Sequence, residues 1–142
     1  MTEASQTKLG VFDLGCGNGS LSHLIAEHGC EVVGVDTSAP GIAISRQSFP
    51  DCQFIQADIY ELLDTDMLNR FDIVLALEVI EHLLYPKELA KNAKNRLKPG
   101  GRLIISTPYH GYLKNLALAV FGKIENHFAV FWDNGHIKLF SV

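Results

Sequence analysis

Apolar segments of strand-like and helix-like period alternate along the 142-residue sequence. This alternation is typical of β-α-β units, which build a largely parallel sheet with helices on both faces. No repeat or linker interrupts it, so we expect one α/β domain over residues 1–142, with a Rossmann-like open sheet. The expected strands are 9–14, 31–36, 53–57, 71–77 and 102–106, and the expected helices are 20–28, 38–49, 86–97 and 112–121.

Local signals support several of these boundaries. Ser38 is placed to cap the second helix, with Pro40 in its first turn, where a missing N–H does no harm. Pro99-Gly100-Gly101 is expected to stop the third helix just before the last strand. Strand 71–77 is almost entirely apolar, as expected for a central strand covered on both faces. In the first helix, Leu21, Leu24 and Ile25 fall on one face.

Composition argues against several classes of protein. The 12 Lys and Arg residues are outnumbered by 16 Asp and Glu, for a net charge of −4, and no basic run suggests a nucleic-acid partner. Three cysteines without a C-x-x-C pair suit reduced thiols in a cytosol-like compartment. The polar start lacks a signal peptide, and no apolar run reaches the roughly 20 residues of a membrane span. We therefore expect a soluble, cytoplasmic protein.

Three glycines, Gly15, Gly17 and Gly19, stand directly between the first strand and the first helix. Glycine allows a sharp turn and close approach of a ligand to the backbone, although a tight strand-to-helix turn alone would also explain the loop. The next strand ends in Asp36, 21 residues beyond Gly15, where a carboxylate can accept hydrogen bonds from ribose hydroxyls. Together these features predict an adenosine-containing cofactor.

The glycine spacing discriminates between cofactors. Dinucleotide sites favour G-x-G-x-x-G, and here Gly19 comes one residue too early for that pattern. Asp13, two residues before Gly15, would repel a pyrophosphate but suits a ligand that carries an ammonium group. We therefore expect a cofactor that is cationic at this end.

The segment from Asp13 to Gly19 resembles the glycine motif of class I S-adenosylmethionine-dependent methyltransferases, and the resemblance covers almost the whole chain. It includes Val35-Asp36, Ala57-Asp58-Ile59 and the turn Leu97 to Gly101. The resemblance implies that the glycine loop and Asp13 hold the methionine part, Asp36 the ribose, and Asp58 with Ile59 the adenine. For Asp58, a helix-capping role is the alternative. The cofactor-binding residues expected in full are Asp13, Gly15, Cys16, Gly17, Gly19, Asp36, Thr37, Asp58, Ile59 and Leu77, and Cys16 is expected to contribute only its backbone.

Glu78, Glu81 and His82 follow strand 71–77 at its carboxyl end, where open α/β sheets place their ligands. If the segment is helical, their spacing puts all three on one face, a plausible site for a divalent cation. The alternative is a solvated helix start, with the carboxylates near the positive end of the helix dipole and His82 packed against the sheet.

Leu77 to His82 is also similar to the matching segment of ubiquinone-biosynthesis O-methyltransferases and of small-RNA 2′-O-methyltransferases. The likeness to the RNA enzymes implies a Mg²⁺ site of Glu78, Glu81 and His82, completed by a downstream histidine. His136 is the preferred candidate and His110 the competing one. Without a cation, His82 or His136 could act as the general base.

We therefore expect a methyltransferase that acts on a small molecule, with O-methylation of a phenol or quinone-precursor hydroxyl preferred. The alternatives are a non-catalytic S-adenosylmethionine-binding module and an NAD-dependent oxidoreductase. The apolar segment 113–121 could shape a substrate pocket, or it could be buried in the core.

The resemblance also predicts an incomplete unit, because five strands are expected where the family has seven. Strand 102–106 would then be an open edge that invites association. The start looks short as well, since only eight polar residues precede Leu9 where the family places a helix. We expect a domain incomplete at the C-terminus, or a homodimer that covers the edge.

Overall fold

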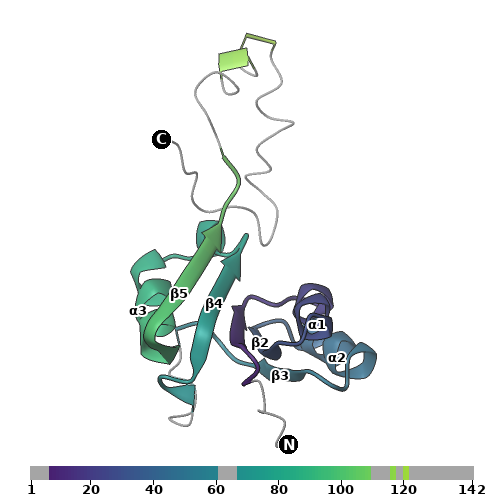
Figure 1. Cartoon of the computed structure of the whole chain (residues 1–142). Helices are drawn as coiled ribbons and strands as arrows, with labels where there is room; N and C mark the ends of the chain where they lie inside the picture. Colours follow the sequence, from purple (N-terminus) through teal and green to yellow (C-terminus); the bar gives the residue numbers. More distant parts are fainter. Residues whose placement is uncertain (1–6, 61–66, 110–115, 118–119, 122–142) are drawn as a thin grey trace, which may run out of the picture.

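The computed structural model describes residues 7–60, 67–109, 116–117 and 120–121. These residues form a parallel five-stranded sheet with the order β3-β2-β1-β4-β5 (Figure 1). The predicted fold class is confirmed. The elements are β1 (Gly10–Leu14), α1 (Ser20–Glu27), β2 (Glu31–Asp36), α2 (Ala39–Ser48), β3 (Gln53–Gln56), β4 (Phe71–Leu77), the 3₁₀ turn η2 (Ile80–His82), α3 (Pro86–Arg96) and β5 (Leu97–Ser106).

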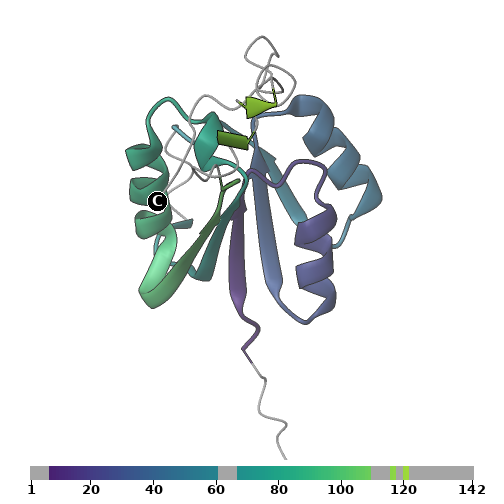
Figure 2. The same cartoon turned by 90° about the horizontal axis from the view of Figure 1, so that it is seen from above.

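The helices lie on both faces of the sheet, as Figure 2 shows, with α1 and α2 on one side and α3 on the other. Neighbouring residues of β1 alternate between the two layers. Phe12 packs in the core cluster that includes Leu89 of α3, whereas Val11 packs in the cluster that includes Ile25 of α1. This alternation follows from the two-residue period of a strand.

The carboxyl ends of β1 and β4 form the topological switch point. From β1, the chain continues to β2 on one side, and β4 pairs with β1 on the other. The loops after these two strands therefore leave the sheet in opposite directions, and ligands of open α/β sheets bind at such a point. Both the glycine loop and Glu78 follow strands that end here.

The last strand begins earlier than the sequence predicts. Leu97 pairs with Phe71, and the regular register resumes at Ile73 and Arg102 after an irregularity. The turn sequence Pro99-Gly100-Gly101 therefore lies inside β5 instead of before it. An irregularity of this kind depends on the partner strand, so the local turn signal alone cannot reveal it.

The buried face of α1 also differs from the prediction. Leu21 and Leu24 are exposed, while Ser22 is fully buried and Ile25 packs against the sheet. The helix is rotated so that the Ser22 hydroxyl reaches Asp13 of β1.

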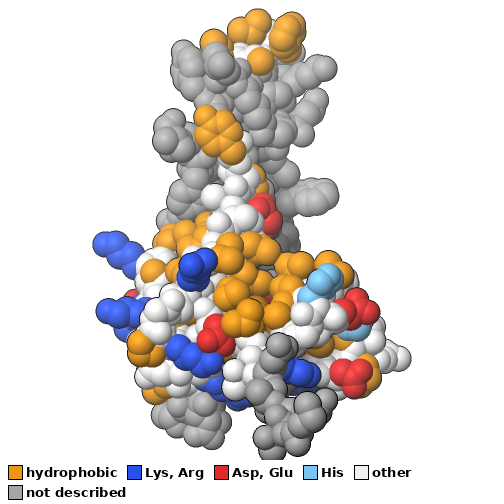
Figure 3. All heavy atoms as spheres, in the orientation of Figure 1, with side chains coloured by type: hydrophobic (Ala, Val, Ile, Leu, Met, Phe, Trp, Pro, Cys, Tyr) orange, Lys and Arg blue, Asp and Glu red, His pale blue; other side chains and the backbone are white. Residues whose placement is uncertain are grey.

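Among the described strands, β5 lies at an edge of the sheet, and it carries exposed apolar side chains. Ile104 is 46% exposed and Ile105 is 40% exposed, on opposite faces of the strand. Figure 3 shows hydrophobic side chains gathered on the face where β4 and β5 lie. Among the helices that the structure describes, none is long and apolar enough to cross a membrane.

Candidate functional site

The three glycines of the loop between β1 and α1 all have left-handed backbone, with φ of 82° at Gly15, 56° at Gly17 and 78° at Gly19. Their surroundings differ. A Cβ at Gly15 would lie 2.4 Å from Cγ2 of Val79, and one at Gly19 would lie 2.6 Å from Cζ of Phe54. A Cβ at Gly17 would meet no atom within 4 Å. Gly15 and Gly19 are therefore required by packing, whereas Gly17 leaves open space in front of the loop.

The N–H groups of this loop are mostly used within the chain. The N–H groups of Gly15 and Cys16 donate to the carbonyl of Val35 at 2.7 and 3.0 Å, and that of Gly19 donates to the carbonyl of Cys16 at 2.9 Å. The N–H of Gly17 donates to Oδ2 of Asp36 at 2.8 Å. A pyrophosphate site needs such donors to face the ligand. The loop therefore does not suit a dinucleotide, in agreement with its glycine spacing.

Asp36 ends β2 and is partly buried beside the loop. Its Oδ2 accepts from Gly17, and its Oδ1 accepts from the N–H of Ser38 at 2.8 Å. A carboxylate has about four acceptor sites, so two remain for ligand hydroxyls. Thr37, the next residue, is exposed. Asp36 can therefore serve a ribose while it also holds the loop.

Asp13 lies beneath the loop, and its carboxylate is buried. Its Oδ2 accepts a hydrogen bond from the Ser22 hydroxyl at 2.6 Å. Burial raises the pKa of Asp13 above its usual value of 3.8; the Ser22 hydrogen bond opposes this rise and the charge of Asp36 adds to it. The glycine motif does not single out Ser22. The signal that reveals it is a polar residue in helical register with Ile25 and Ala26, which pack against the sheet.

The side chain of Cys16 faces away from the open side of the loop. It is buried in a cluster with Ile42 and Phe54. Burial, together with the charges of Asp13 and Asp36, raises the pKa of the thiol to about 12. The thiol therefore stays protonated, consistent with a contribution from the backbone alone.

The segment after β3 lies at the same edge of the sheet. Oδ1 of Asp58 accepts from the N–H of Tyr60 at 2.9 Å, which stabilises the turn in the way a capping residue would. The carbonyl of Ile59 accepts from Nδ2 of Asn92 on α3 at 2.6 Å, and the Ile59 side chain packs against the core. The hydrogen bond of Asp58 does not prevent this segment from meeting an adenine.

The segment after β4 is not the helix on which the cation site depends. Glu78 has left-handed backbone with φ of 56°, and only the three residues Ile80–His82 form a 3₁₀ turn. Glu78 is exposed, Glu81 is buried and His82 is partly buried. The expectation that helical spacing places them on one face is therefore wrong. In the part of the chain that the structure describes, no group of three or more His, Cys, Asp or Glu side chains could hold a metal ion.

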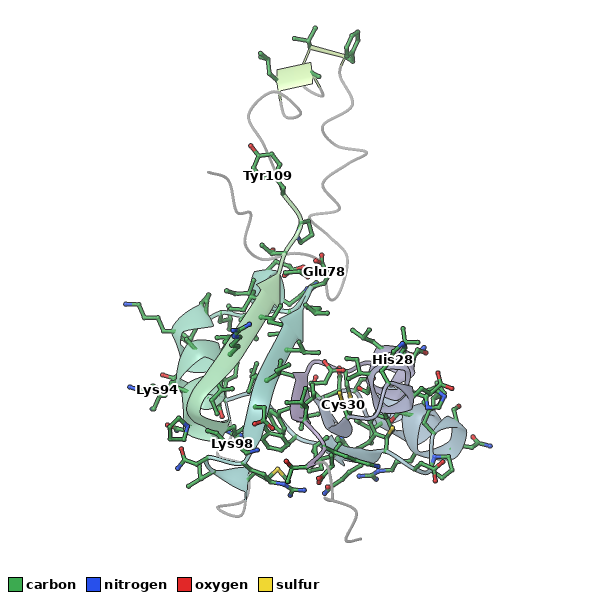
Figure 4. All side chains as sticks on the ribbon, viewed as in Figure 1. His28, Cys30, Glu78, Lys94, Lys98 and Tyr109 are labelled. Atoms are coloured by element: carbon green, nitrogen blue, oxygen red, sulfur yellow. The ribbon has the colours of Figure 1, made fainter. Side chains whose placement is uncertain are left out.

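Glu78 is tied to β5. Its N–H donates to the carbonyl of Ser106 at 3.1 Å, and the Ser106 hydroxyl donates to Oε1 of Glu78 at 2.7 Å. Ser106 pairs with Leu77, the last residue of β4. Figure 4 shows Glu78 at the end of the sheet opposite to Lys98. The carboxylate is thus held at the carboxyl edge of the sheet, beside the loop that contacts Val79.

Several predicted site residues lie outside the part of the chain that the structure describes. His136 and His110 lie outside the described residues, so the fourth metal ligand and the alternative base remain predictions. Within the apolar segment 113–121, the structure describes residues 116, 117, 120 and 121, and the large side chains among them, Leu116, Val120 and Phe121, are exposed. Burial of these three side chains in the core is therefore contradicted.

The fold and the loop define an open, parallel α/β domain with a glycine loop at its topological switch point. The methyltransferase domain family matches residues 12–103, and the chain belongs to this family. The ubiquinone biosynthesis O-methyltransferase of Coxiella burnetii (strain Dugway 5J108-111) is 39% identical over 100 residues, which cover 68% of this chain and 42% of the relative. The protein of the same name from Azorhizobium caulinodans is 39% identical over 119 residues, 80% of this chain and 46% of the relative.

A solved S-adenosylmethionine-dependent methyltransferase from Mesorhizobium loti has a similar structure, with a TM-score of 0.65 and 29% identity over 72% of this chain and 48% of that chain. The chain spans less than half the length of both of these curated relatives.

Proposed function

We propose that this chain is the cofactor-binding part of an S-adenosylmethionine-dependent methyltransferase that methylates a hydroxyl oxygen of a small phenol or quinone precursor. The observation that carries the proposal is the open left-handed position of Gly17 next to Asp36 at the switch point. The names of the relatives support the substrate class.

The residues fit the cofactor. Gly17 leaves room for a ligand, Asp36 has acceptor sites left for two ribose hydroxyls, and Asp58 and Ile59, which we propose for the adenine, follow β3 at the same edge of the sheet. The buried carboxylate of Asp13 supplies negative charge beneath the loop, which favours the ammonium group of the methionine part. Thr37 and Leu77 flank the site at the ends of β2 and β4.

S-adenosylmethionine supplies a methyl group already activated by its sulfonium. A new bond forms between the acceptor oxygen and the methyl carbon as the carbon–sulfur bond breaks, and S-adenosylhomocysteine leaves. The protein has to align the acceptor and take its hydroxyl proton. We propose His82 or His136 as the base.

A Mg²⁺ site of Glu78, Glu81, His82 and His136 would be the alternative to a histidine base, because a bound cation would lower the pKa of the acceptor hydroxyl. The three described residues of this set do not fit a cation, since Glu78 is exposed, Glu81 is buried and they form no group that could hold a metal ion. We therefore propose the histidine base alone, and activity should persist in excess chelator. Loss of activity in excess chelator that added magnesium restores would contradict this form of the proposal.

The test of the function is the formation of S-adenosylhomocysteine by the purified full-length protein with a panel of phenols. Binding of S-adenosylmethionine without turnover across the panel would favour the non-catalytic module. Saturable binding of NAD, with no binding of S-adenosylmethionine, would contradict the proposal.

We also propose a cytoplasmic location and a homodimer. Three free cysteines support a reducing compartment. The apolar edge strand β5 supports self-association.

A further inference from the structure

Helix α3 turns two polar side chains into the core. Its buried residues, Leu89, Asn92, Ala93 and Arg96, follow the spacing of one helix face. Asn92 is 5% exposed and Arg96 is 1% exposed. Buried polar groups destabilise a fold unless they are hydrogen-bonded, so their partners indicate why they are there.

Arg96 donates two hydrogen bonds to Asn92. Its Nη1 donates to Oδ1 of Asn92 at 2.8 Å and to the backbone carbonyl of the same residue at 3.1 Å. The guanidinium lies over the ring of Phe12, 5.2 Å from the ring centre. Arg96 is thus held in place by the sheet on one side and faces the amide of Asn92 on the other.

The amide of Asn92 links Arg96 to the segment after β3, because its Nδ2 donates to the carbonyl of Ile59 at 2.6 Å. The orientation of the amide follows from its neighbours. A guanidinium can only donate hydrogen bonds and a carbonyl can only accept them, so the oxygen must face Arg96 and the NH₂ must face Ile59.

A second contact joins α3 to the same segment. The N–H of Tyr85, which caps α3, donates to the hydroxyl of Tyr60 at 3.2 Å, and the two rings meet edge to face with centres 6.1 Å apart. Within the segment, Asp58 bonds the N–H of Tyr60. Helix α3 therefore holds the turn from Asp58 to Tyr60 from two positions along its length.

We propose that Asn92 is a positioning residue for the adenine-binding segment, and that Arg96 orients its amide for this task. The inference rests on the proposed function, because it takes Asp58 and Ile59 as the adenine contact. Helix α3 lies outside the cofactor motifs. In this proposal, it controls how well the adenine end of the site is formed before the cofactor binds.

Asn92→Asp is the most informative variant. A carboxylate has the same size as the amide and still accepts from Arg96, now as an ion pair, but it repels the carbonyl of Ile59. If Asn92 serves only to pair with Arg96 inside the core, the variant keeps this role. If Asn92 positions the carbonyl of Ile59, the variant loses it. Asn95→Asp is the matched control, because it adds the same charge to the same helix at a side chain that is only partly buried.

For Asn92→Asp in the full-length protein, we expect a melting temperature close to that of the parent. We expect affinity for S-adenosylhomocysteine about fivefold to tenfold weaker, the scale of one hydrogen bond. The KM for S-adenosylmethionine should rise while kcat and the acceptor KM stay unchanged. Without any ligand, hydrogen exchange at the Tyr60 amide should be faster. Asn95→Asp should match the parent in every measurement.

A folded Asn92→Asp variant with parental affinity and parental exchange at Tyr60 would overturn the inference, and so would equal losses in both variants. If Asn92→Asp does not fold, Arg96→Met is the second test. This variant keeps an apolar stem near Phe12 but frees the Asn92 amide to rotate. Parental cofactor affinity and parental exchange at Tyr60 in Arg96→Met would also overturn the inference. A parent protein that does not bind S-adenosylhomocysteine would contradict the proposed function instead, and the exchange measurement would still show whether Asn92 holds the segment.

Discussion

Gly17 donates its backbone N–H to Oδ2 of Asp36 across 2.8 Å, so the carboxylate proposed to bind the ribose also holds the glycine loop. The other carboxylate oxygen accepts from Ser38 at the start of α2. Asp36 therefore joins the end of β2 to the glycine loop, which lies 19 residues earlier, and to the start of α2, which follows directly. Loss of this side chain should affect both the shape of the site and its contact with the cofactor.

Asp36→Ala is expected to weaken S-adenosylmethionine binding by about 1–3 kcal/mol, the range for hydrogen bonds to a charged group. Titration calorimetry measures the change. Asp51→Ala, at an exposed carboxylate before β3, is the control and should bind as the parent does. Parental affinity in a folded Asp36→Ala variant would exclude Asp36 from the site.

Gly17→Ala and Gly29→Ala form a matched pair. Both glycines have left-handed backbone, with φ of 56° and 90°, and a Cβ at either one would meet no atom within 4 Å. Each substitution should therefore destabilise the fold by a similar amount, about 1–2 kcal/mol. Only Gly17→Ala should also reduce cofactor affinity, because its methyl group enters the space left for the ligand. Equal cofactor affinity in the two variants, measured by calorimetry, would place the ligand elsewhere.

The pKa of Asp13 predicts a pH dependence of stability. Burial raises this pKa above 3.8, so the folded state binds the proton more strongly than the unfolded state. The stability contributed by Asp13 is then complete below pH 3.8 and is lost as the pH rises through the folded-state pKa. Asp13→Asn should therefore gain free energy of unfolding relative to the parent as the pH rises towards neutrality.

Urea unfolding at a series of pH values measures this difference. Ser22→Ala serves as the companion variant. Loss of its hydrogen bond to Asp13 removes an influence that lowers the Asp13 pKa, so the loss of stability with rising pH should be steeper. A stability difference between parent and Asp13→Asn that does not change with pH would contradict the prediction.

The uncovered side chains of β5 predict self-association of the 142-residue chain. Parallel strands are normally covered on both faces, and Ile104 and Ile105 are exposed on opposite faces. Ile104→Lys should shift the chain towards monomer in light scattering over a range of concentrations. Leu9→Lys, which also replaces an exposed apolar side chain but before β1, should not. A parent chain that stays monomeric at every concentration would argue against the dimer.

The central strands could be predicted from the sequence because their signal is local. The apolar run that predicts strand 71–77 coincides with β4, since a strand covered on both faces needs apolar residues throughout. The bounds of β2 are also as predicted, and Ser38 caps α2 through its hydroxyl, which accepts from Gly41.

The features that could not be predicted depend on contacts between distant segments. The start of β5 depends on the pairing of Leu97 with Phe71. The backbone of Glu78 departs from a helix where it bonds Ser106, 28 residues away. The contact of Asn92 with Ile59 joins residues 33 apart, and a local sequence pattern does not show which distant carbonyl a buried amide meets.

The backbone of Glu78 implies a conflict between stability and activity at this position. A side chain with φ near 56° costs of order 1–3 kcal/mol, and glycine avoids this cost. Glu78→Gly removes this strain together with the exposed hydrogen bond from Ser106, and the strain is the larger of the two contributions. The variant should therefore resist heat better than the parent, but it has lost an acidic group at the edge of the site. A screen for thermostable variants that does not measure turnover would select this change. The variant it recovers would be more thermostable and less active than the parent.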